Sequence, residues 1–283
     1  MFPEQRNRQL YIMGESYGGK YAASLAHKIT VENGVLPPEH KINLKGIGIG
    51  NGFCDPINMI HWGDFLFTIG MAGYEERDRF RELAQAARQQ IKKEKWTLAA
   101  RLIDTILGGV MTPGHTSMFT NVTAYNYYFN FRLPVEPKEF TYYFQFLDLI
   151  PVREAIHVGK TVYHNSRKVQ TKIFPDMGRS VKNKIENLLN KGLKVLVYNG
   201  MLDIAVAYPL TESFVDNLEW EHKEGFDAAP RWQWKFGAEM AGYVKEHKNL
   251  GLVLVRNAGH LVPFDQPVLG FDLVNRFTSS KMF

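Results

Sequence analysis

Residues 10–19 of the chain read LYIMGESYGG. Leu10–Met13 predicts a short buried strand, and Tyr17–Thr30 predicts a helix. The Gly-x-Ser-x-Gly pattern between them is typical of a tight turn that holds a serine side chain exposed between a strand and a helix. The first N–H groups of the following helix would point at a developing negative charge. Ser16 is therefore a candidate nucleophile, and an ordinary glycine-rich turn is the alternative interpretation.

A serine hydroxyl needs a base, usually a histidine that a carboxylate orients, and at such turns the chain order is serine, acid, histidine. His260 follows the predicted strand Leu252–Val255, and Asp203 follows the predicted strand Val195–Tyr198. Loops at strand ends are where folds of this kind place catalytic groups. The order and the setting therefore predict a triad of Ser16, Asp203 and His260.

The other candidates fit this pattern less well. Asp265 is a rival acid, but its place before Gln266-Pro267 predicts a helix cap. The other eight histidines lie in polar helices, in loops or in the middle of the chain. Cys54 is the only cysteine; we expect a small buried residue after a strand rather than a reactive thiol.

The outline of the chain predicts an α/β fold with a parallel sheet and a cap. The sequence divides into 1–54 with the serine turn, a mostly helical insertion over 55–175, and 176–283 with the acid and the histidine. Helices are predicted over Glu75–Leu107, Pro151–His157, Lys182–Asn190 and a C-terminal stretch with Leu269, Leu273 and Phe277 on one stripe, and further strands over Lys45–Gly50, Trp232–Phe236 and Ala241–Val244. Within the first helix, Tyr21, Leu25 and Ile29 are spaced for a common apolar face.

Composition excludes some classes of function. The chain has 283 residues, a net charge of +5 and a pI near 9.1. Its basic residues between Arg77 and Lys95 are mixed with acidic ones, which favours a solvated helix face over a nucleic-acid surface. No stretch approaches the roughly 20 apolar residues of a membrane span. We expect no nucleic-acid partner, no membrane span, no metal and no cofactor.

Four segments together resemble the serine carboxypeptidase family. They are GESYGGKY at 14–21, IGNG at 49–52 with Asp55-Pro56, YNG at 198–200 with Asp203, and AGHLVP at 258–263 with DQP at 265–267. Further likeness at 41–44 and 155–159 is nearest to the vitellogenic-like members. The resemblance implies an α/β-hydrolase fold with a helical cap and a serine-type carboxypeptidase that acts on the C-termini of peptides and proteins.

The resemblance also implies roles for single residues. Ser16 would attack the last peptide bond, His260 would carry the proton, and Asp203 would orient His260. The backbone N–H of Tyr17 would supply one oxyanion donor. Glu15 would bind the terminal carboxylate of the substrate, which requires a proton between the two carboxylates and so implies an acidic optimum.

The chain lacks several features of the family pattern. The family's Asn-Gly-Gly-Pro-Gly segment, which supplies a second oxyanion donor, is absent, as are the signal peptide and the cap cysteines. We therefore expect an N-terminally truncated chain that is inactive alone. The family implies the secretory route, ending in a lysosome-like compartment or outside the cell, and Asn121 in Asn121-Val122-Thr123 is a candidate glycosylation site.

Two other functions remain open at this stage. The same triad could hydrolyse esters or transfer an acyl group to an alcohol, because an acyl-enzyme can be given to either acceptor. The chain could instead be a non-catalytic secretory homologue that kept the fold. The preferred C-terminal residue and the oligomeric state stay open too.

Overall fold

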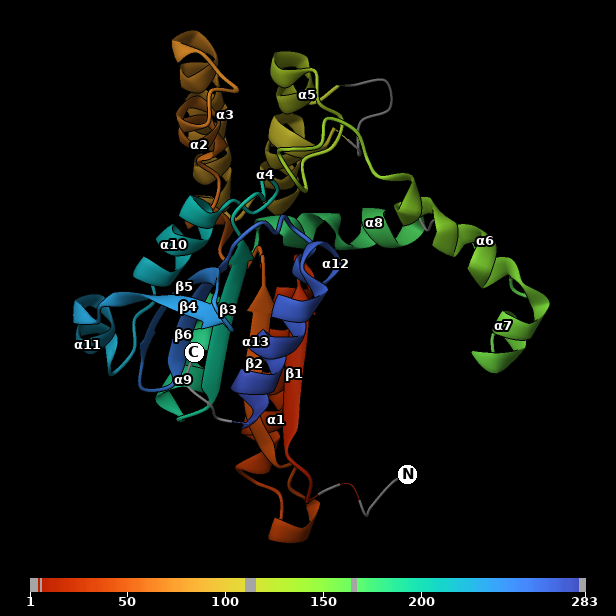
Figure 1. Ribbon diagram of the computed structural model, residues 1–283, viewed down its shortest axis with the longest axis vertical. Helices are drawn as coiled ribbons and strands as arrows, with labels where there is room; N and C mark the ends of the chain where they lie inside the picture. The colour runs from red at the N-terminus through yellow and green to blue at the C-terminus, as the bar shows by residue number, and fades with distance from the viewer. Residues whose placement is uncertain (1–4, 6, 110–115, 164–166, 280–283) are drawn as a thin grey trace.

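A computed structural model describes residues 5, 7–109, 116–163 and 167–279 of the chain (Figure 1). The described strands form one sheet in the order β1-β2-β3-β6-β5-β4. The first four neighbours in this order are parallel: β1 (Leu10–Glu15), β2 (Leu44–Gly50), β3 (Lys194–Gly200) and β6 (Leu250–Val255). The last two are antiparallel: β5 (Glu239–His247) and β4 (Arg231–Phe236). Every strand predicted from the sequence is present, and those at 241–244 and 252–255 pair with each other.

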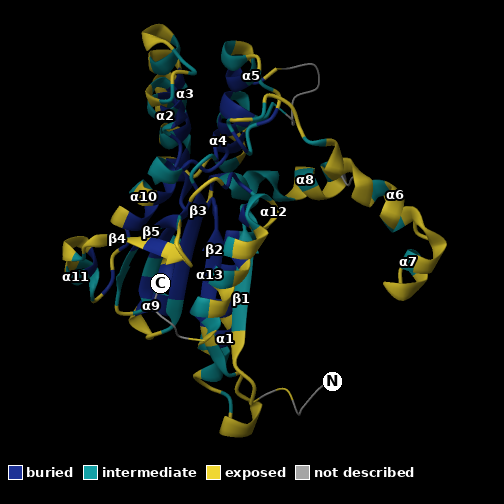
Figure 2. Cartoon of the chain, in the orientation of Figure 1, coloured by how far each residue is buried: buried dark blue, intermediate teal, exposed yellow. Residues whose placement is uncertain are grey.

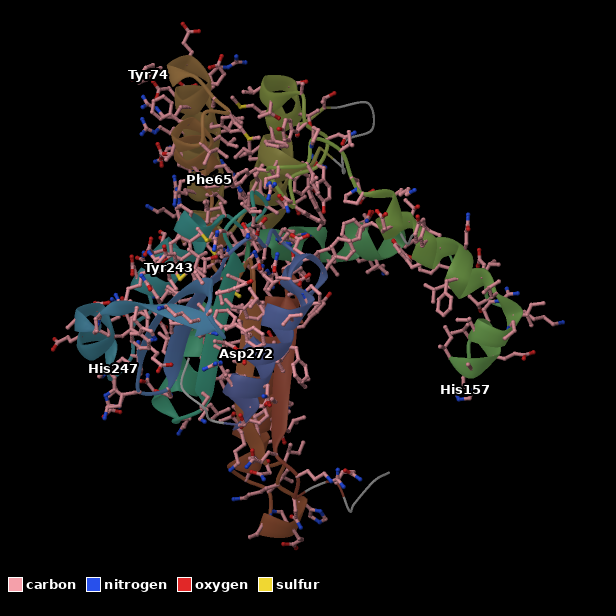
Figure 3. The ribbon with its side chains drawn as sticks, in the orientation of Figure 1. Phe65, Tyr74, His157, Tyr243, His247 and Asp272 are labelled. Carbon is pink, nitrogen blue, oxygen red and sulfur yellow. The ribbon has the colours of Figure 1, made fainter. Side chains whose placement is uncertain are left out.

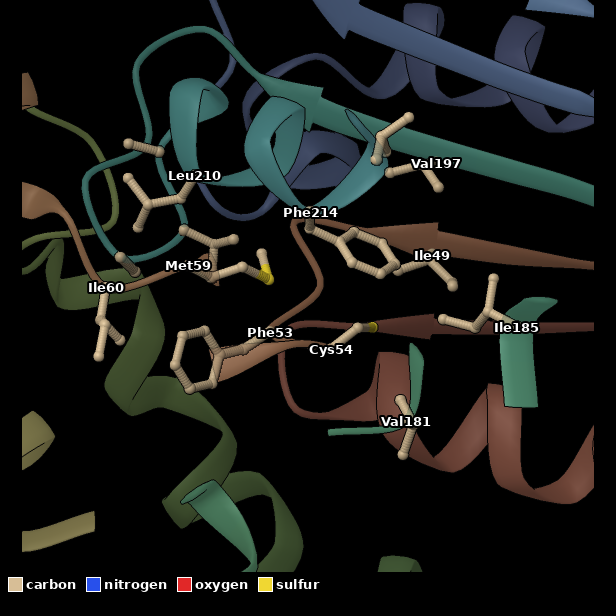
Figure 4. Packing of buried hydrophobic residues seen from close by; sticks show 14 of the residues in the cluster. Ile49, Phe53, Cys54, Met59, Ile60, Val181, Ile185, Val197, Leu210 and Phe214 are labelled. Atoms are coloured by element: carbon tan, nitrogen blue, oxygen red, sulfur yellow. The ribbon is translucent and has the colours of Figure 1, made fainter. Parts of the chain in front are cut away.

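Helices cover both faces of the sheet and create two apolar cores. On one face lie α1 (Gly18–Asn33), α9 (Lys182–Asn190) and α10 (Tyr208–Asp216), whose buried side chains join those of β2 and β3 (Figure 4). On the other face lies α13 (Pro267–Ser279), whose Leu273 and Phe277 pack in one cluster with β3, β5 and β6 (Figure 1). A sheet buried on both faces explains why β2, β3 and β6 are nearly continuous apolar runs.

The predicted apolar face of α1 is wrong. Tyr21 and Leu25 are 58% and 53% exposed, and only Ile29 of that stripe is buried. The face that meets the sheet instead carries Ala22, Ala23 and Ala26. Small side chains let the helix approach the sheet closely, so the largest apolar residues of α1 were a poor guide to its buried side.

Between β2 and α9 the described residues contain no strand, only helices joined by loops. They are η3 (Pro56–Asn58), α2 (Trp62–Thr68), α3 (Tyr74–Lys92), α4 (Trp96–Ile103), the π-helical η4 (Asp104–Gly108), α5 (Met118–Thr123), η5 (Lys138–Thr141), α6 (Tyr142–Asp148), α7 (Ile150–Ala155), α8 (Arg167–Ile173) and η6 (Phe174–Gly178). We call this region the cap. The boundaries predicted at 54/55 and 175/176 stay a prediction.

The cap has two visibly different parts. Helices α2 to α5 stand beyond one end of the sheet, whereas α6 and α7 extend away from the body as an arm (Figure 1). The arm is mostly exposed (Figure 2), including its apolar residues Phe146, Leu149 and Ile150. None of the described helices combines the length and the apolar character needed to cross a membrane.

The helix predicted over 75–107 is three helical segments. The chain breaks between α3 and α4, where Glu94 has a φ of 54°, a left-handed conformation that interrupts a helix. The second segment then passes into η4, which ends at Gly109 with a φ of 64°. The predicted range therefore covers α3, α4 and most of η4, and the break falls just before Trp96.

Other short helices complete the chain. They are η2 (Pro38–His40), α11 (Lys223–Ala228) and α12 (Val262–Asp265). The last one directly follows His260 and therefore helps to place the turn that carries it.

Candidate active site

Ser16 lies at a strained turn between β1 and α1. Its φ is 58°, a left-handed conformation that is rare outside glycine and concentrates at functional sites. The turn is held by a hydrogen bond from the Ser16 N–H to the Gly50 carbonyl at 2.8 Å. A side chain at Gly14 would place its Cβ 2.0 Å from the Gly18 carbonyl oxygen, so the turn closes only with glycine there. The predicted strand–turn–helix setting is therefore present.

Ser16 and His260 line the same pocket, of about 320 Å³, at the carboxyl end of the parallel strands. Its walls are mainly apolar and come largely from the cap, including Trp62, Phe129 and Phe174. A larger hollow of about 940 Å³ lies between α3 and α5 and contains neither of these two residues. The smaller pocket brings a strained serine together with a buried histidine that is bonded to a carboxylate.

Asp203 is fully buried and its Oδ2 accepts three hydrogen bonds. The donors are His260 Nδ1 at 2.8 Å, Asn51 Nδ2 at 2.7 Å and the Val206 N–H at 3.1 Å. Such bonds to a carboxylate are charge-assisted and stabilise its ionised form. These three bonds fix the carboxylate group, which in turn holds the imidazole in one orientation.

His260 is 1% exposed, and its Nδ1 is bonded to Asp203. Burial lowers its pKa, but the charge and hydrogen bond of Asp203, together with the charge of Glu15, raise the pKa more, so that it lies above the usual value. Among the described residues Nε2 has no hydrogen-bond partner. Because Nδ1 is bonded to Asp203, Nε2 is the nitrogen that remains to exchange a proton in the pocket.

Glu15 precedes Ser16 and is the most perturbed carboxyl group of the site. Burial raises its pKa to about 7; the charge of His260 opposes this rise and that of Asp203 adds to it. Glu15 also raises the pKa of Tyr198, whose larger cause is burial. A carboxyl group with this pKa is mostly protonated in acid and can donate a hydrogen bond there.

A buried lysine connects the serine turn to the pocket wall. Lys20 lies on the first turn of α1, and its Nζ donates to the carbonyl oxygens of Asp176 and Arg179 at 2.5 and 2.6 Å. Tyr17 donates its hydroxyl to Asp176 Oδ2 at 2.6 Å. These contacts fix η6, which carries Phe174 of the pocket, against the helix that follows Ser16. The backbone N–H of Tyr17 lies at the N-terminus of α1, beside Ser16.

Known proteins resemble this chain over almost its whole length. A model of the serine carboxypeptidase family, peptidase S10, matches residues 1–280. The chain belongs to the serine carboxypeptidase family. It is 41% identical to the venom serine carboxypeptidase of Apis mellifera over 100% of its own length. It is 36% identical to the vitellogenic carboxypeptidase of Aedes aegypti over 98% of its own length.

The chain spans only part of the length of its relatives. The chain spans 60% and 58% of those two relatives and 59% of the probable serine carboxypeptidase CPVL of Homo sapiens, to which it is 38% identical over 99% of its own length. A solved structure of Kex1(Δ)p, a prohormone-processing carboxypeptidase from Saccharomyces cerevisiae, superposes with a TM-score of 0.76 at 22% identity. It covers 99% of this chain and 64% of that one. The family and the α/β-hydrolase fold predicted from the sequence are confirmed.

Asp265 does not have the capping role predicted for it. It is the last residue of α12, and its Oδ2 accepts hydrogen bonds from the Gly259 N–H at 2.6 Å and from Asn130 Nδ2 at 3.2 Å. Its carboxylate thus braces the turn before His260, because that turn needs an acceptor for its N–H. The rival acid belongs to the site as a support, while Asp203 is the acid that contacts the imidazole.

The remaining histidines that the structure places lie elsewhere. Figure 3 shows His157 on the arm and His247 at the opposite side of the molecule, both away from the serine turn. His115 and His164 lie outside the described residues. In the part of the chain that is described, no group of three or more His, Cys, Asp or Glu side chains is placed to hold a metal ion.

Two further predicted residues have clear environments. Cys54 is fully buried, and burial raises its pKa to about 12, so the thiol is protonated and enclosed as expected of a small core residue (Figure 4). Asn121 is exposed on α5. It is therefore accessible, although it lies on a short helix rather than in a loop.

The sequence did not lead us to predict Asn51 or Phe129 as residues of the site. Asn51 follows β2 directly, has a φ of 43°, and lies 152 residues before its partner Asp203. The rule that singled out Asp203, a polar residue just after a parallel strand, would have found it. Phe129 offered no such signal, since it lies in an irregular aromatic part of the cap and reaches His260 only in the folded protein.

Proposed function

We propose that this protein is a serine-type carboxypeptidase that removes C-terminal amino acids from peptides. The observation that carries the proposal is the His260–Asp203 pair, which faces the same pocket as Ser16 at its strained turn. Membership of the serine carboxypeptidase family supports it. The peptide or protein C-terminus is the substrate, and neither a metal nor a cofactor takes part in the steps below.

The reaction assigns one role to each residue. Ser16 Oγ attacks the carbonyl carbon of the last peptide bond while His260 Nε2 takes its proton. The carbonyl oxygen becomes an oxyanion, to which the Tyr17 N–H donates. His260 then gives the proton to the leaving amino acid as the bond breaks, and water repeats the sequence to release the acyl group. Asp203 stabilises the imidazolium that forms twice in this cycle.

Glu15 explains how the last residue of a chain is selected. In its protonated form it can donate a hydrogen bond to the terminal carboxylate of the substrate. Once ionised it repels the same carboxylate. A pKa of about 7 therefore restricts peptide cleavage to the acidic side of neutrality.

The test uses the full-length protein and an N-blocked dipeptide with a free C-terminus. Release of the C-terminal amino acid at acid pH is expected, with little release from the matching C-terminal amide. Turnover of an ester without any peptide cleavage would sink the carboxypeptidase proposal in favour of an esterase, and transfer to an added alcohol would favour an acyltransferase. No reaction at Ser16 with a fluorophosphonate would favour a non-catalytic homologue.

The variant Glu15→Gln tests the carboxylate role by its pH profile. In the wild type, kcat/KM for the free-acid peptide should fall as pH rises through about 7, where Glu15 loses its proton. Glutamine keeps a neutral donor, so this fall should disappear. Because the charge of Glu15 raises the pKa of His260, its removal should also move the acid limb to lower pH. An unchanged alkaline fall in Glu15→Gln would contradict the role.

We further propose the secretory route as the location, in a lysosome-like compartment or outside the cell. The exposed Asn121 supports a glycosylated protein, and the relative from Apis mellifera is a venom protein by name. Peptide mapping of protein secreted from cells should find glycan on Asn121. An unmodified Asn121 in all secreted molecules would contradict the glycosylation.

A further inference from the structure

Residues 128–131 of the cap, which we call the strap, are bonded to the loop that carries Asp203. The Tyr128 carbonyl accepts hydrogen bonds from the N–H groups of Ile204 and Ala205 at 3.2 and 2.9 Å. The Phe131 N–H donates to the Leu202 carbonyl at 2.9 Å. The strap therefore follows the Asp203 loop on both sides of the carboxylate.

The same strap is bonded to the turn that carries His260. The His260 N–H donates to the Phe129 carbonyl at 2.6 Å. Asn130 Nδ2 reaches Asp265, which also braces Gly259. A Cβ at Gly259 would lie 2.1 Å from the Phe129 carbonyl oxygen, so the close approach depends on glycine. One short piece of the cap thus joins the two loops that hold the acid and the base.

The side chain of Phe129 lies against the imidazole itself. Its ring is 4.5 Å from the His260 ring, centroid to centroid, with 25° between the planes. Phe129 also lines the pocket beside Ser16 and His260. The imidazole is then fixed at Nδ1 by Asp203 and on one face by Phe129. A rotation of the ring would break the bond to Asp203 and lose the stacking contact together.

We propose that Phe129 is a positioning residue for His260, which keeps Nε2 directed at Ser16 from the cap side. The inference rests on the proposed function, because it assumes that His260 is the base for Ser16. It adds that the cap supplies a part of the triad's orientation. Phe129 acts through the imidazole and needs no contact with the substrate for this effect.

The test compares Phe129→Leu with the wild type in the full-length protein. Leucine keeps an apolar side chain but loses the ring. Misplacing a reacting group by a fraction of an ångström to one ångström costs about 10- to 100-fold in rate. We expect a loss of that order in kcat, with KM changed far less. We expect the same loss in the rate at which a small fluorophosphonate labels Ser16, and Phe129→Tyr should recover both.

Phe140→Leu is the matched control. Phe140 is another cap phenylalanine, with its ring 4.5 Å from that of Phe264, but it does not contact His260. In Phe140→Leu, the fluorophosphonate should label Ser16 at the same rate as in the wild type. If Phe129→Leu does not fold by circular dichroism, Phe129→Met repeats the comparison with an unbranched side chain.

The outcomes separate this inference from the proposed function. If Phe129→Leu raises KM for peptides but labels as fast as the wild type, Phe129 contacts substrate only and the positioning role is overturned. If the wild type labels at Ser16 without cleaving peptides, the carboxypeptidase proposal is wrong and the labelling rates still decide on Phe129. A wild type that does not label at Ser16 overturns both.

Discussion

Replacing Ser16 with alanine in the full-length protein is expected to lower kcat for peptide release on the order of 10⁶-fold. Losses of this size follow when a serine nucleophile is removed while the rest of the site stays in place. Alanine, like serine, is not branched at Cβ, so it adds no steric conflict at a φ of 58° and the turn should persist. The rate is measured with the blocked dipeptide at acid pH, and a thermal unfolding curve verifies that the variant is folded.

Ser24→Ala is the control for this result. Ser24 lies on the same helix, where its Oγ accepts a hydrogen bond from Lys184 at 2.9 Å, away from the pocket. It should retain peptide cleavage and fluorophosphonate labelling. Full activity in Ser16→Ala would show that the nucleophile is another residue.

Replacing Asp203 with asparagine should lower kcat by up to about 10⁴-fold, the loss known for the equivalent change in serine protease triads, where the imidazole also takes the wrong tautomer. Here the amide has little choice of orientation. The Val206 N–H is a fixed donor at the Oδ2 position, so the amide oxygen should stay there, where it can still accept from His260 Nδ1. The hydrogen bond survives, but the negative charge that stabilises the imidazolium is lost.

The pH profile distinguishes this loss of charge from a loss of structure. Asp203 raises the pKa of His260, so removing its charge should lower that pKa and move the acid limb of kcat/KM to lower pH. Asp265→Asn is the control, because its amide oxygen can still accept from the Gly259 N–H, and its loss of rate should be far smaller. An equal or larger loss of rate in Asp265→Asn would indicate that Asp265, and not Asp203, is the acid of the triad.

Much of the site was predictable because local rules act at single strand ends. A polar side chain after a parallel strand comes to the same edge of the sheet as its neighbours, and this rule is sufficient for Ser16, Asp203 and His260. The strained turn at Ser16 was also predictable, because steric contacts within five residues, two of them glycines, determine its conformation.

The remaining features depend on contacts between distant segments. Asn51 and Asp203 meet across 152 residues, and Lys20 meets the carbonyl of Asp176 across 156. The buried side of α1 was mispredicted because close packing on the sheet favours Ala22 and Ala26 over the larger Tyr21 and Leu25. The position of Phe129 had no periodic signal at all, because irregular backbone holds it through hydrogen bonds to two other loops.

The strap has a consequence for the order in which the protein is made. His260 follows Ser16 by more than two hundred residues, and ribosomes add about 5–20 residues per second. For tens of seconds a growing chain therefore carries its serine without the base, and the strap, which is made earlier, has no His260 turn to hold. The proposed activity can begin only after the turn of His260, the last of these segments, has been made.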